Sequence, residues 1–184
     1  VSEKYPITIA TVGNFKPEAI RLVKHLQSEY DQVVLIGHPF FIKDVLETGA
    51  DEGIRWNKKR LRMLFCSEGF NEAWRRYVVK STKSPFVLES ALNTYGSSEL
   101  LLMGHETPLS VLTRTIADED SAFKKRLFKR AAVPNLFQYN PYMRYIESVG
   151  NDLLFTAASG IPMIRFNLKD SGILLSYEQV TSEL

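Results

Sequence analysis

The chain has 184 residues, of which 45% are hydrophobic, 24% charged and 11% aromatic, and this composition excludes a mainly disordered chain, a collagen-like repeat and a disulfide-stapled miniprotein. The length fits one domain, residues 1–184, with room for a sizeable core. Lys and Arg total 23 against 21 for Asp and Glu, and the net charge of +2 gives no reason to expect a dedicated nucleic-acid binder.

The first forty residues predict a strand, a helix and a second strand. Residues 7–12 form a β-branched run that residues 13–15 break. Pro17 then suits the first turn of a helix, in which apolar residues recur every three or four positions. Residues 32–37 are apolar on both faces, as in a buried strand. The three segments together are typical of a parallel βαβ unit with a right-handed crossover.

The rest of the chain continues to alternate between strand-like and helix-like patterns. The predicted elements are a short helix or turn at 40–46, strands at 60–65, 85–88 and 100–103, and helices at 69–80, 109–116 and 122–132. Near the end, residues 163–166 and 173–175 predict a hairpin joined through residues 170–172. We therefore expect an α/β fold, a Rossmann-like open sheet with parallel core strands, flanking helices and an irregular C-terminal part.

Other features of the sequence bear on where the protein works. Cys66 is the single cysteine and has no internal disulfide partner, which favours a reducing compartment. Residues 1–6 have no apolar core and do not resemble a secretion signal. No apolar run approaches the roughly 18–20 residues that span a bilayer. We therefore expect a cytoplasmic protein without a membrane span.

Several well-known catalytic motifs are absent from the sequence. There is no GxxxxGK[ST] phosphate loop, and the first turn after the predicted strand at 7–12 does not read GxGxxG. Neither HExxH nor CxxC occurs, and three scattered histidines with one cysteine do not favour a zinc site. Candidate site residues therefore have to be chosen from their place in the predicted fold.

Ligands of open parallel sheets bind beyond the carboxyl ends of the strands. The predicted strands deliver polar or glycine residues to that edge: Thr11, Gly13, Asn14, His38, Glu89, His105 and Glu106. Backbone amides at helix starts suit anions, whereas imidazoles and carboxylates suit proton or metal chemistry. Each residue also has a structural interpretation: a tight turn for Gly13, a loop hydrogen bond for His38, and buried partners for His105 and Glu106.

Charged clusters have two interpretations each. Residues 118–120 have the DxD spacing of diphosphate-bound metal sites, although acidic residues between two helices commonly cap the second helix. Basic residues at 55–62 and 124–130 could hold a diphosphate or a nucleic-acid backbone, but solvated surfaces explain such clusters more often. Nucleic acid is therefore a partner that the sequence permits without favouring it.

Four stretches in the first half resemble GT-A-fold glycosyltransferases, particularly the inverting family 2. They are residues 7–18, with the sequence Lys16-Pro17-Glu18 at the helix start, the strand at 33–36, the helix start at 68–74, and the strand at 83–88. The chain departs from that family where its DxD motif should follow the last strand, because Glu89-Ser90-Ala91 stands there.

This resemblance implies an enzyme, or a degenerate relative of one, that transfers a sugar from a nucleotide-diphosphate donor to a hydroxyl acceptor. Thr11 and Asn14 would contact the nucleotide, and Glu89 would stand at the position of a Mn²⁺ or Mg²⁺ ion. His105 or Glu106 would be the base that deprotonates the acceptor.

A second resemblance uses some of the same residues. Nucleotide-sensing CRISPR-associated Rossmann-fold domains also begin with a strand and a turn similar to Thr11-Val12-Gly13, and residues 104–108 are a loose counterpart of their later glycine-rich turn. This resemblance implies a module that binds a nucleotide or oligonucleotide without sugar transfer. A third alternative is an α/β domain that serves the assembly of a larger complex.

Overall fold

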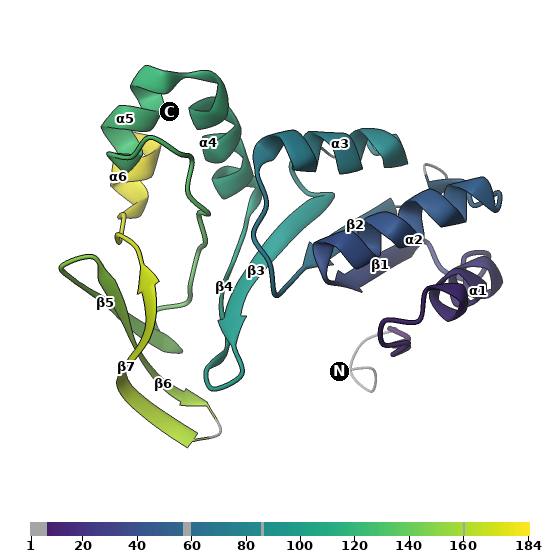
Figure 1. Cartoon of the computed structure of the whole chain (residues 1–184), viewed down its shortest axis with the longest axis horizontal. Coiled ribbons are helices and arrows are strands. Elements are labelled where there is room, and N and C mark those ends of the chain that lie inside the picture. The colour runs from purple at the N-terminus through teal and green to yellow at the C-terminus, as the bar shows by residue number, and fades with distance from the viewer. Residues whose placement is uncertain (1–6, 57–59, 86, 160) are drawn as a thin grey trace.

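The computed structural model describes residues 7–56, 60–85, 87–159 and 161–184. Its first half is built on a four-stranded sheet in the order β1-β2-β3-β4 (Figure 1). The strands are β1 (Gln32–Gly37), β2 (Arg60–Phe65), β3 (Ala91–Ser97) and β4 (Leu101–His105). Strands β1, β2 and β3 run parallel to one another, and β4 pairs antiparallel with β3. The expected α/β fold with parallel core strands is confirmed.

Three helices cover one face of this sheet. They are α1 (Lys16–Leu26), α2 (Pro39–Asp51) and α3 (Glu72–Thr82). Side chains from all three helices and from β2 and β3 form one hydrophobic cluster, which includes Ile20, Leu46, Phe65 and Val79. Each crossover helix therefore packs on the same side, and the amino end of each helix lies at the carboxyl end of the strands that it connects.

The second half surrounds a smaller antiparallel sheet in the order β5-β6-β7 (Figure 1). Its elements are α4 (Pro108–Glu119), α5 (Ser121–Phe128), β5 (Arg144–Val149), β6 (Asp152–Ser159), β7 (Ile161–Ser171) and α6 (Tyr177–Thr181). An extended segment, residues 129–143, connects α5 to β5. Phe155 and Ile146 of this sheet pack against Leu100 and Met103, which joins the two sheets through a second cluster.

The expected C-terminal hairpin was wrong in its pairing. Residues 163–166 belong to β7, but β7 pairs with β6 rather than with residues 173–175, which form no strand. A second hairpin joins β5 to β6 through Gly150, whose φ of +63° is a backbone conformation that glycine adopts readily. The prediction missed β6, so its β7 segment was paired with the wrong neighbour.

Two expected strands in the first half were also wrong. Residues 7–12 form no strand, and they lie largely exposed ahead of α1. Residues 85 and 87–88 form a loop and turn, residue 86 lies outside the described residues, and the strand itself begins later, at Ala91. The parallel βαβ arrangement does exist, but it starts one unit later than expected, with β1, α2 and β2.

The helix boundaries agree with the local capping chemistry. Thr107 caps α4: its side chain accepts a hydrogen bond from the Ser110 amide at 3.3 Å, and the amide of Thr107 donates to the Ser110 hydroxyl in return. Asp120 likewise caps α5. Among the described residues, no helix combines the length and the apolar character that crossing a membrane requires.

Candidate functional site

Pairing across the first sheet places several predicted site residues along one row. Gly37 pairs with Phe65, and Phe65 pairs with Asn93. The carbonyl of Asn93 accepts a 2.8 Å hydrogen bond from the amide of Glu106. His38 therefore lies at one end of this row and His105 at the other, with the sheet between them.

His38 lies in an aromatic neighbourhood. It is the N-cap residue of α2, but its ring makes no capping hydrogen bond. The ring lies 5.6 Å from that of Phe40, and Phe40 in turn meets Trp74 edge-on at 6.3 Å. The indole nitrogen of Trp74 is buried without a hydrogen-bond partner in the part of the chain that the structure describes.

Thr11, Gly13 and Asn14 lie in the turn that leads into α1. All three are exposed, and Gly13 has a φ of +55° that suits a tight turn. None of the three lines a cavity that the structure describes. The structure therefore does not bring them into a common pocket with His105 and Glu106.

Glu89 lies away from the row as well. Its carboxylate forms an exposed 3.1 Å ion pair with Arg62. Arg62 directly precedes Met63, the residue of β2 that pairs with Ala91 at the start of β3. Three residues of strand, about 10 Å, separate Ala91 at that start from Thr94, which pairs with His105. The expectation that Glu89 lies at the carboxyl edge of the sheet was wrong, because β3 begins after Glu89, which therefore lies before the amino end of that strand.

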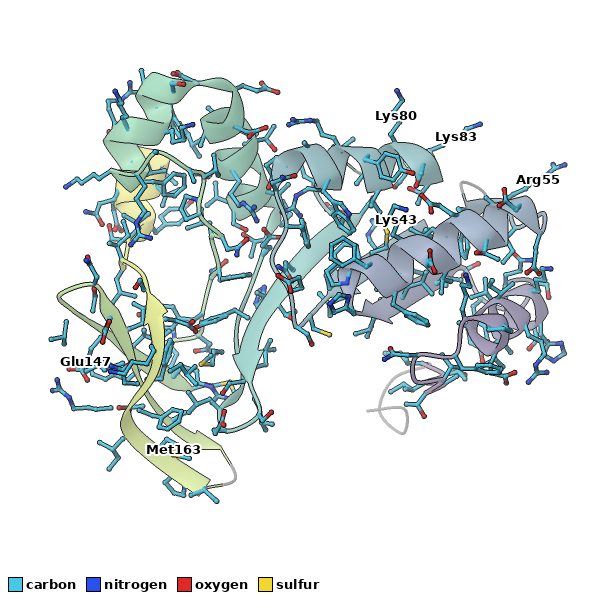
Figure 2. All side chains as sticks on the ribbon, in the orientation of Figure 1. Lys43, Arg55, Lys80, Lys83, Glu147 and Met163 are labelled. Carbon is cyan, nitrogen blue, oxygen red and sulfur yellow. The ribbon has the colours of Figure 1, made fainter. Side chains whose placement is uncertain are left out.

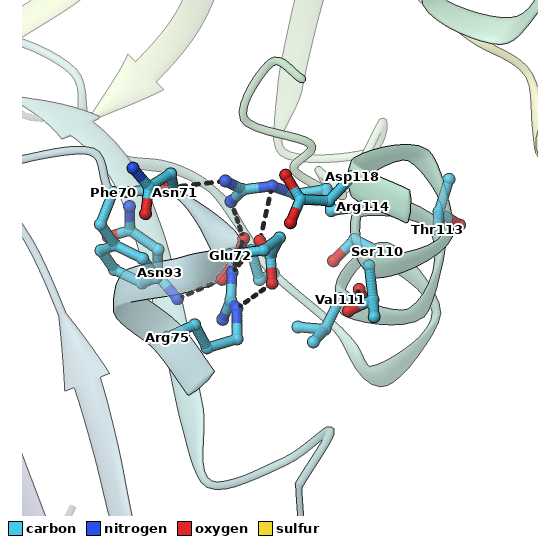
Figure 3. Close-up of polar contacts among 12 residues, drawn as sticks. Phe70, Asn71, Glu72, Arg75, Asn93, Ser110, Val111, Thr113, Arg114 and Asp118 are labelled. Carbon is cyan, nitrogen blue, oxygen red and sulfur yellow. Dashed lines mark hydrogen bonds and ion pairs between the residues drawn. The ribbon is translucent and has the colours of Figure 1, made fainter. Parts of the chain in front are cut away.

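Glu106 belongs to a buried group of four charges, which we call the ionic quartet: Glu72, Arg75, Glu106 and Arg114 (Figure 3). One carboxylate oxygen of Glu106 accepts bonds from Arg75 at 2.6 Å and from Arg114 at 2.5 Å. The other oxygen accepts the backbone amide of Asn93 at 2.8 Å. Each of the four residues is almost completely buried.

The arginines of the quartet tie α3 and α4 to the sheet. Arg75 donates to the carbonyl of Ala91, and Arg114 donates to the carbonyl of Phe70 at 2.7 Å. Burial lowers the pKa of Arg75, but hydrogen bonds and charge attraction from Glu106 and Glu72 outweigh it and raise the pKa overall. Two negative and two positive charges compensate each other, as buried charges must.

The quartet was not foreseen from the sequence. Glu72 and Arg75 have the i, i+3 spacing that brings side chains together on a helix, and this was the available signal. The sequence could not show that Arg114 and Glu106 would meet that pair, because each lies 31 or more residues from Arg75.

A large cavity lies beyond β4, between the two sheets. We call it the intersheet cavity; its volume is about 660 Å³. Its lining comes from residues of β3 and β4, the start of α4, residues 128 and 130 at the end of α5, residues 134–139 and 141, β5 and β6, and residues 170–177 and 180. In Figure 1 it lies in the region enclosed by β4, the segment after α5 and β7.

Aromatic rings and a few polar groups face the intersheet cavity. Tyr95 and Phe137 stack with their ring centroids 5.4 Å apart. The Tyr95 hydroxyl donates a 2.5 Å hydrogen bond to Asp170. Burial and this bond raise the pKa of Tyr95 well above its usual value. Arg130 adds an exposed cation to the lining.

The acidic residues at 118–120, for which the sequence allows either a metal site or a helix cap, stabilise the fold. The Asp120 carboxylate accepts bonds from the amides of Ala122 and Phe123, which lower its pKa, and Asp118 pairs with Arg76 at 2.9 Å. These contacts confirm the capping interpretation.

The two basic clusters do not form one surface. Arg55 lies at the opposite end of the molecule from α5, which carries the second cluster (Figures 1 and 2). Lys58 and Lys59 lie outside the described residues. Lys80 and Lys83, at the end of α3, project on the same side of the view as Arg55 (Figure 2). The basic side chains at this end of the molecule therefore come from separate segments of the chain.

The residues present do not fit a metal centre made by the protein. Within residues 7–56, 60–85, 87–159 and 161–184, no group of three or more His, Cys, Asp or Glu side chains is arranged to hold a metal ion. Glu89, the expected ligand of Mn²⁺ or Mg²⁺, is paired with an arginine instead. We therefore derive no chemical step through a metal.

Comparison of the chain with models of known protein families finds no match, and comparison with curated protein sequences finds no significant relative. The resemblances described above therefore depend on the quoted residues alone. The geometry of the row, the ionic quartet and the intersheet cavity is the basis for assigning a function.

Proposed function

We propose that this chain is a binding module that holds a nucleotide-class small molecule in the intersheet cavity and transfers no group from it. The observation that carries this proposal is the cavity itself, whose lining combines stacked aromatic rings with Asp170 and Arg130. Its volume of about 660 Å³ falls within the roughly 300–1,000 Å³ of small-molecule sites.

The lining matches the parts of a nucleotide. A planar base can pack against the rings of Tyr95 and Phe137. Asp170 has lone pairs beyond the one used by Tyr95, and these can accept a hydrogen bond from a base amino group or a ribose hydroxyl. The guanidinium of Arg130 supplies a cation with the fork geometry that phosphate oxygens prefer.

Sugar transfer has less support from the geometry. A general base needs a free lone pair within reach of the acceptor hydroxyl. Both oxygens of Glu106 already accept hydrogen bonds, and the side chain is buried. His105 is exposed, and the carbonyl of Glu106, 3.0 Å from its Nδ1, can only accept a hydrogen bond, which leaves a free lone pair on Nε2. His105 is therefore the one of the two predicted bases that keeps a lone pair for an acceptor. Nor do the residues that the structure describes form the metal site that the resemblance implies for a donor sugar.

A thermal-shift panel tests the proposal. The panel contains nucleoside mono- and diphosphates, nucleotide sugars and oligoadenylates, each with and without Mn²⁺. A ligand at 100 times its Kd stabilises the folded state by about 2.7 kcal/mol, or roughly 5–10 °C for a chain of this size. We expect such a shift with a nucleotide and without any effect of Mn²⁺. The absence of a shift with every nucleotide would refute the proposal, and a shift that requires Mn²⁺ together with a nucleotide sugar would favour the transferase.

Two matched variants locate the site. Arg130 lines the cavity and is exposed, so Arg130→Ala should fold normally and weaken binding about tenfold or more. Lys125 is also exposed and basic but does not line the cavity, and Lys125→Ala changes the net charge equally. Equal weakening by the two variants would indicate general charge attraction and would remove the site from the cavity.

A further inference from the structure

The free edge of β1 has unusual properties for an exposed edge. β1 lies at the end of the four-stranded sheet, and its six residues, Gln32–Gly37, carry no charge. Val34 is 46% exposed and Ile36 is 67% exposed. Exposed edges are usually protected by a charged residue, a proline or a bulge, because their unpaired backbone groups accept a further strand. The edge of β1 carries none of these within its six residues.

The chain itself carries a candidate strand next to this edge. Residues 7–12 read Ile-Thr-Ile-Ala-Thr-Val, and the β-branched residues among them favour extended backbone. Ile7 and Ile9 are exposed. The structure gives no backbone hydrogen bond between the described residues 7–12 and β1. A strand with one free edge and a β-branched segment that forms no strand are therefore separated in the chain by α1 and the turns that flank it.

Residues 7–12 have one side-chain contact near each end. The Thr8 hydroxyl is hydrogen-bonded to the hydroxyl of Tyr30, which precedes β1 by two residues. At the other end, Val12 packs against the same hydrophobic cluster as Val33 and Leu35 of β1. The amino end of the segment therefore lies near the start of β1, and its carboxyl end lies near the middle of the core.

The helices give the same direction. The chain moves from β1 through α2 to β2 and through α3 to β3, each time to the next strand on the same side. Helix α1 contacts α2, and in Figure 1 it lies at the end of the molecule away from α4 and α5. A strand that precedes α1 and lies outside β1 continues this progression, with the crossover hand that parallel units almost always adopt.

We propose that the edge of β1 is the docking site of residues 7–12, which pair with it in parallel as a fifth strand in a second state of the molecule. In that state Val12 lies beside Leu35 on the helix-covered face, and Ile9 and Thr11 lie on the face of Val34 and Ile36. Docking also carries Gly13 and Asn14 to the carboxyl edge beside His38. We call residues 7–12 the strap. Docking of the strap thus brings three predicted ligand residues together: Gly13, Asn14 and His38.

Engineered disulfides test the docked arrangement. All variants carry Cys66→Ser, so that the added cysteines have no competing thiol. Val34→Cys is combined with Thr11→Cys, with Ile9→Cys or with Ala10→Cys, and the three strap positions are all exposed. Residues 9 and 11 share a face of the strap, whereas residue 10 points to the opposite face. With Val12 beside Leu35, residue 11 lies directly beside residue 34, whereas residue 9 shares its face but lies two residues further along the strand, about 8 Å away and beyond disulfide reach. We therefore expect an intramolecular disulfide with residue 11 to form about tenfold faster than with residue 9 or residue 10.

Hydrogen exchange gives an independent measurement on the unmodified chain. Alternate amides of β1 point to its free edge, and docking should slow their exchange about tenfold or more relative to an undocked edge. Ala10→Pro removes a donor from the strap and should restore fast exchange at those amides. Equal disulfide rates at residues 9, 10 and 11, or exchange at the outer amides that Ala10→Pro does not change, would overturn the proposal.

Discussion

The ionic quartet and the intersheet cavity both gather polar side chains from distant parts of the chain, but these side chains face different surroundings. In the quartet, the oxygens of Glu106 are satisfied by Arg75, Arg114 and the Asn93 amide. In the cavity, Arg130 and Asp170 border open space. Polar groups that are satisfied internally stabilise a fold, whereas polar groups that face open space are available to a ligand.

This comparison predicts that Glu106 acts through stability. Glu106→Gln leaves the two buried arginines with one carboxylate and should lower the free energy of unfolding by about 3–5 kcal/mol, as breaking a buried ion pair does. The measurement is urea denaturation followed by circular dichroism.

Glu89→Gln is the matched control for this change. It makes the same chemical substitution in an exposed ion pair and should cost less than about 1 kcal/mol. If the two variants lose similar stability, the quartet does not hold α3 and α4 to the sheet. Nucleotide binding by Glu106→Gln, measured where the variant is folded, should equal that of the unmodified chain.

Elements with a local pattern could be predicted from the sequence. The helix at 16–26 has apolar residues at helical spacing, the strand at 32–37 is a compact apolar run, and the strand at 60–65 has an apolar residue at every second position from Leu61 onward. β3 was missed because Ala91 to Ser97 contains small and polar residues that are typical of a loop. The buried side chain of Asn93 has partners on both sides, because it donates to the carbonyl of Glu68 and accepts from the amide of Thr94.

The candidate site was predictable only in part. The carboxyl-edge rule placed His38 correctly, at the carboxyl end of β1. His105 reaches the same row for another reason, because β4 runs antiparallel to β3 and ends beside Thr94. The rule could not anticipate that Glu106 would be enclosed by arginines, or that a cavity would open on the far side of β4. Both features depend on how α4 and the second sheet pack, and no local residue spacing encodes that packing.

The cap of α4 connects the quartet and the cavity, and it offers a test of intermediate size. Thr107 lines the cavity and follows Glu106 directly. Thr107→Ala removes the capping bond to the Ser110 amide and should lower the free energy of unfolding by about 1 kcal/mol. It should also loosen the start of α4, which forms part of the cavity wall, and weaken ligand binding modestly.

The control for this variant lies on the same helix. The Thr115 hydroxyl bonds to the carbonyl of Val111 within α4, so Thr115→Ala removes no cap and should change stability by no more than about 0.5 kcal/mol. Denaturation curves of the two variants can be compared directly. A larger loss for Thr115→Ala would show that the helix interior, and not its cap, supports this wall.

The smallest expected effect concerns Tyr95 at the cavity wall. Burial, followed by the hydrogen bond to Asp170, raises the pKa of Tyr95. A raised pKa means that the folded state keeps the proton after the unfolded state has lost it. Stability from this contact is therefore complete below about pH 10, the usual pKa of tyrosine, and falls as the pH rises above that value. Tyr95→Phe should remove this part of the alkaline loss.

Ultraviolet titration of phenolate absorbance measures the effect directly. The difference between the unmodified chain and Tyr95→Phe gives the titration of Tyr95 itself, which we expect well above the usual pKa of tyrosine. Asp170→Asn removes the acceptor's charge and should lower the pKa of Tyr95 part of the way, because burial remains the larger cause. Ionisation of Tyr95 near pH 10 in the unmodified chain would mean that the wall of the cavity is open to water, and the ring would then be a weak support for a bound base.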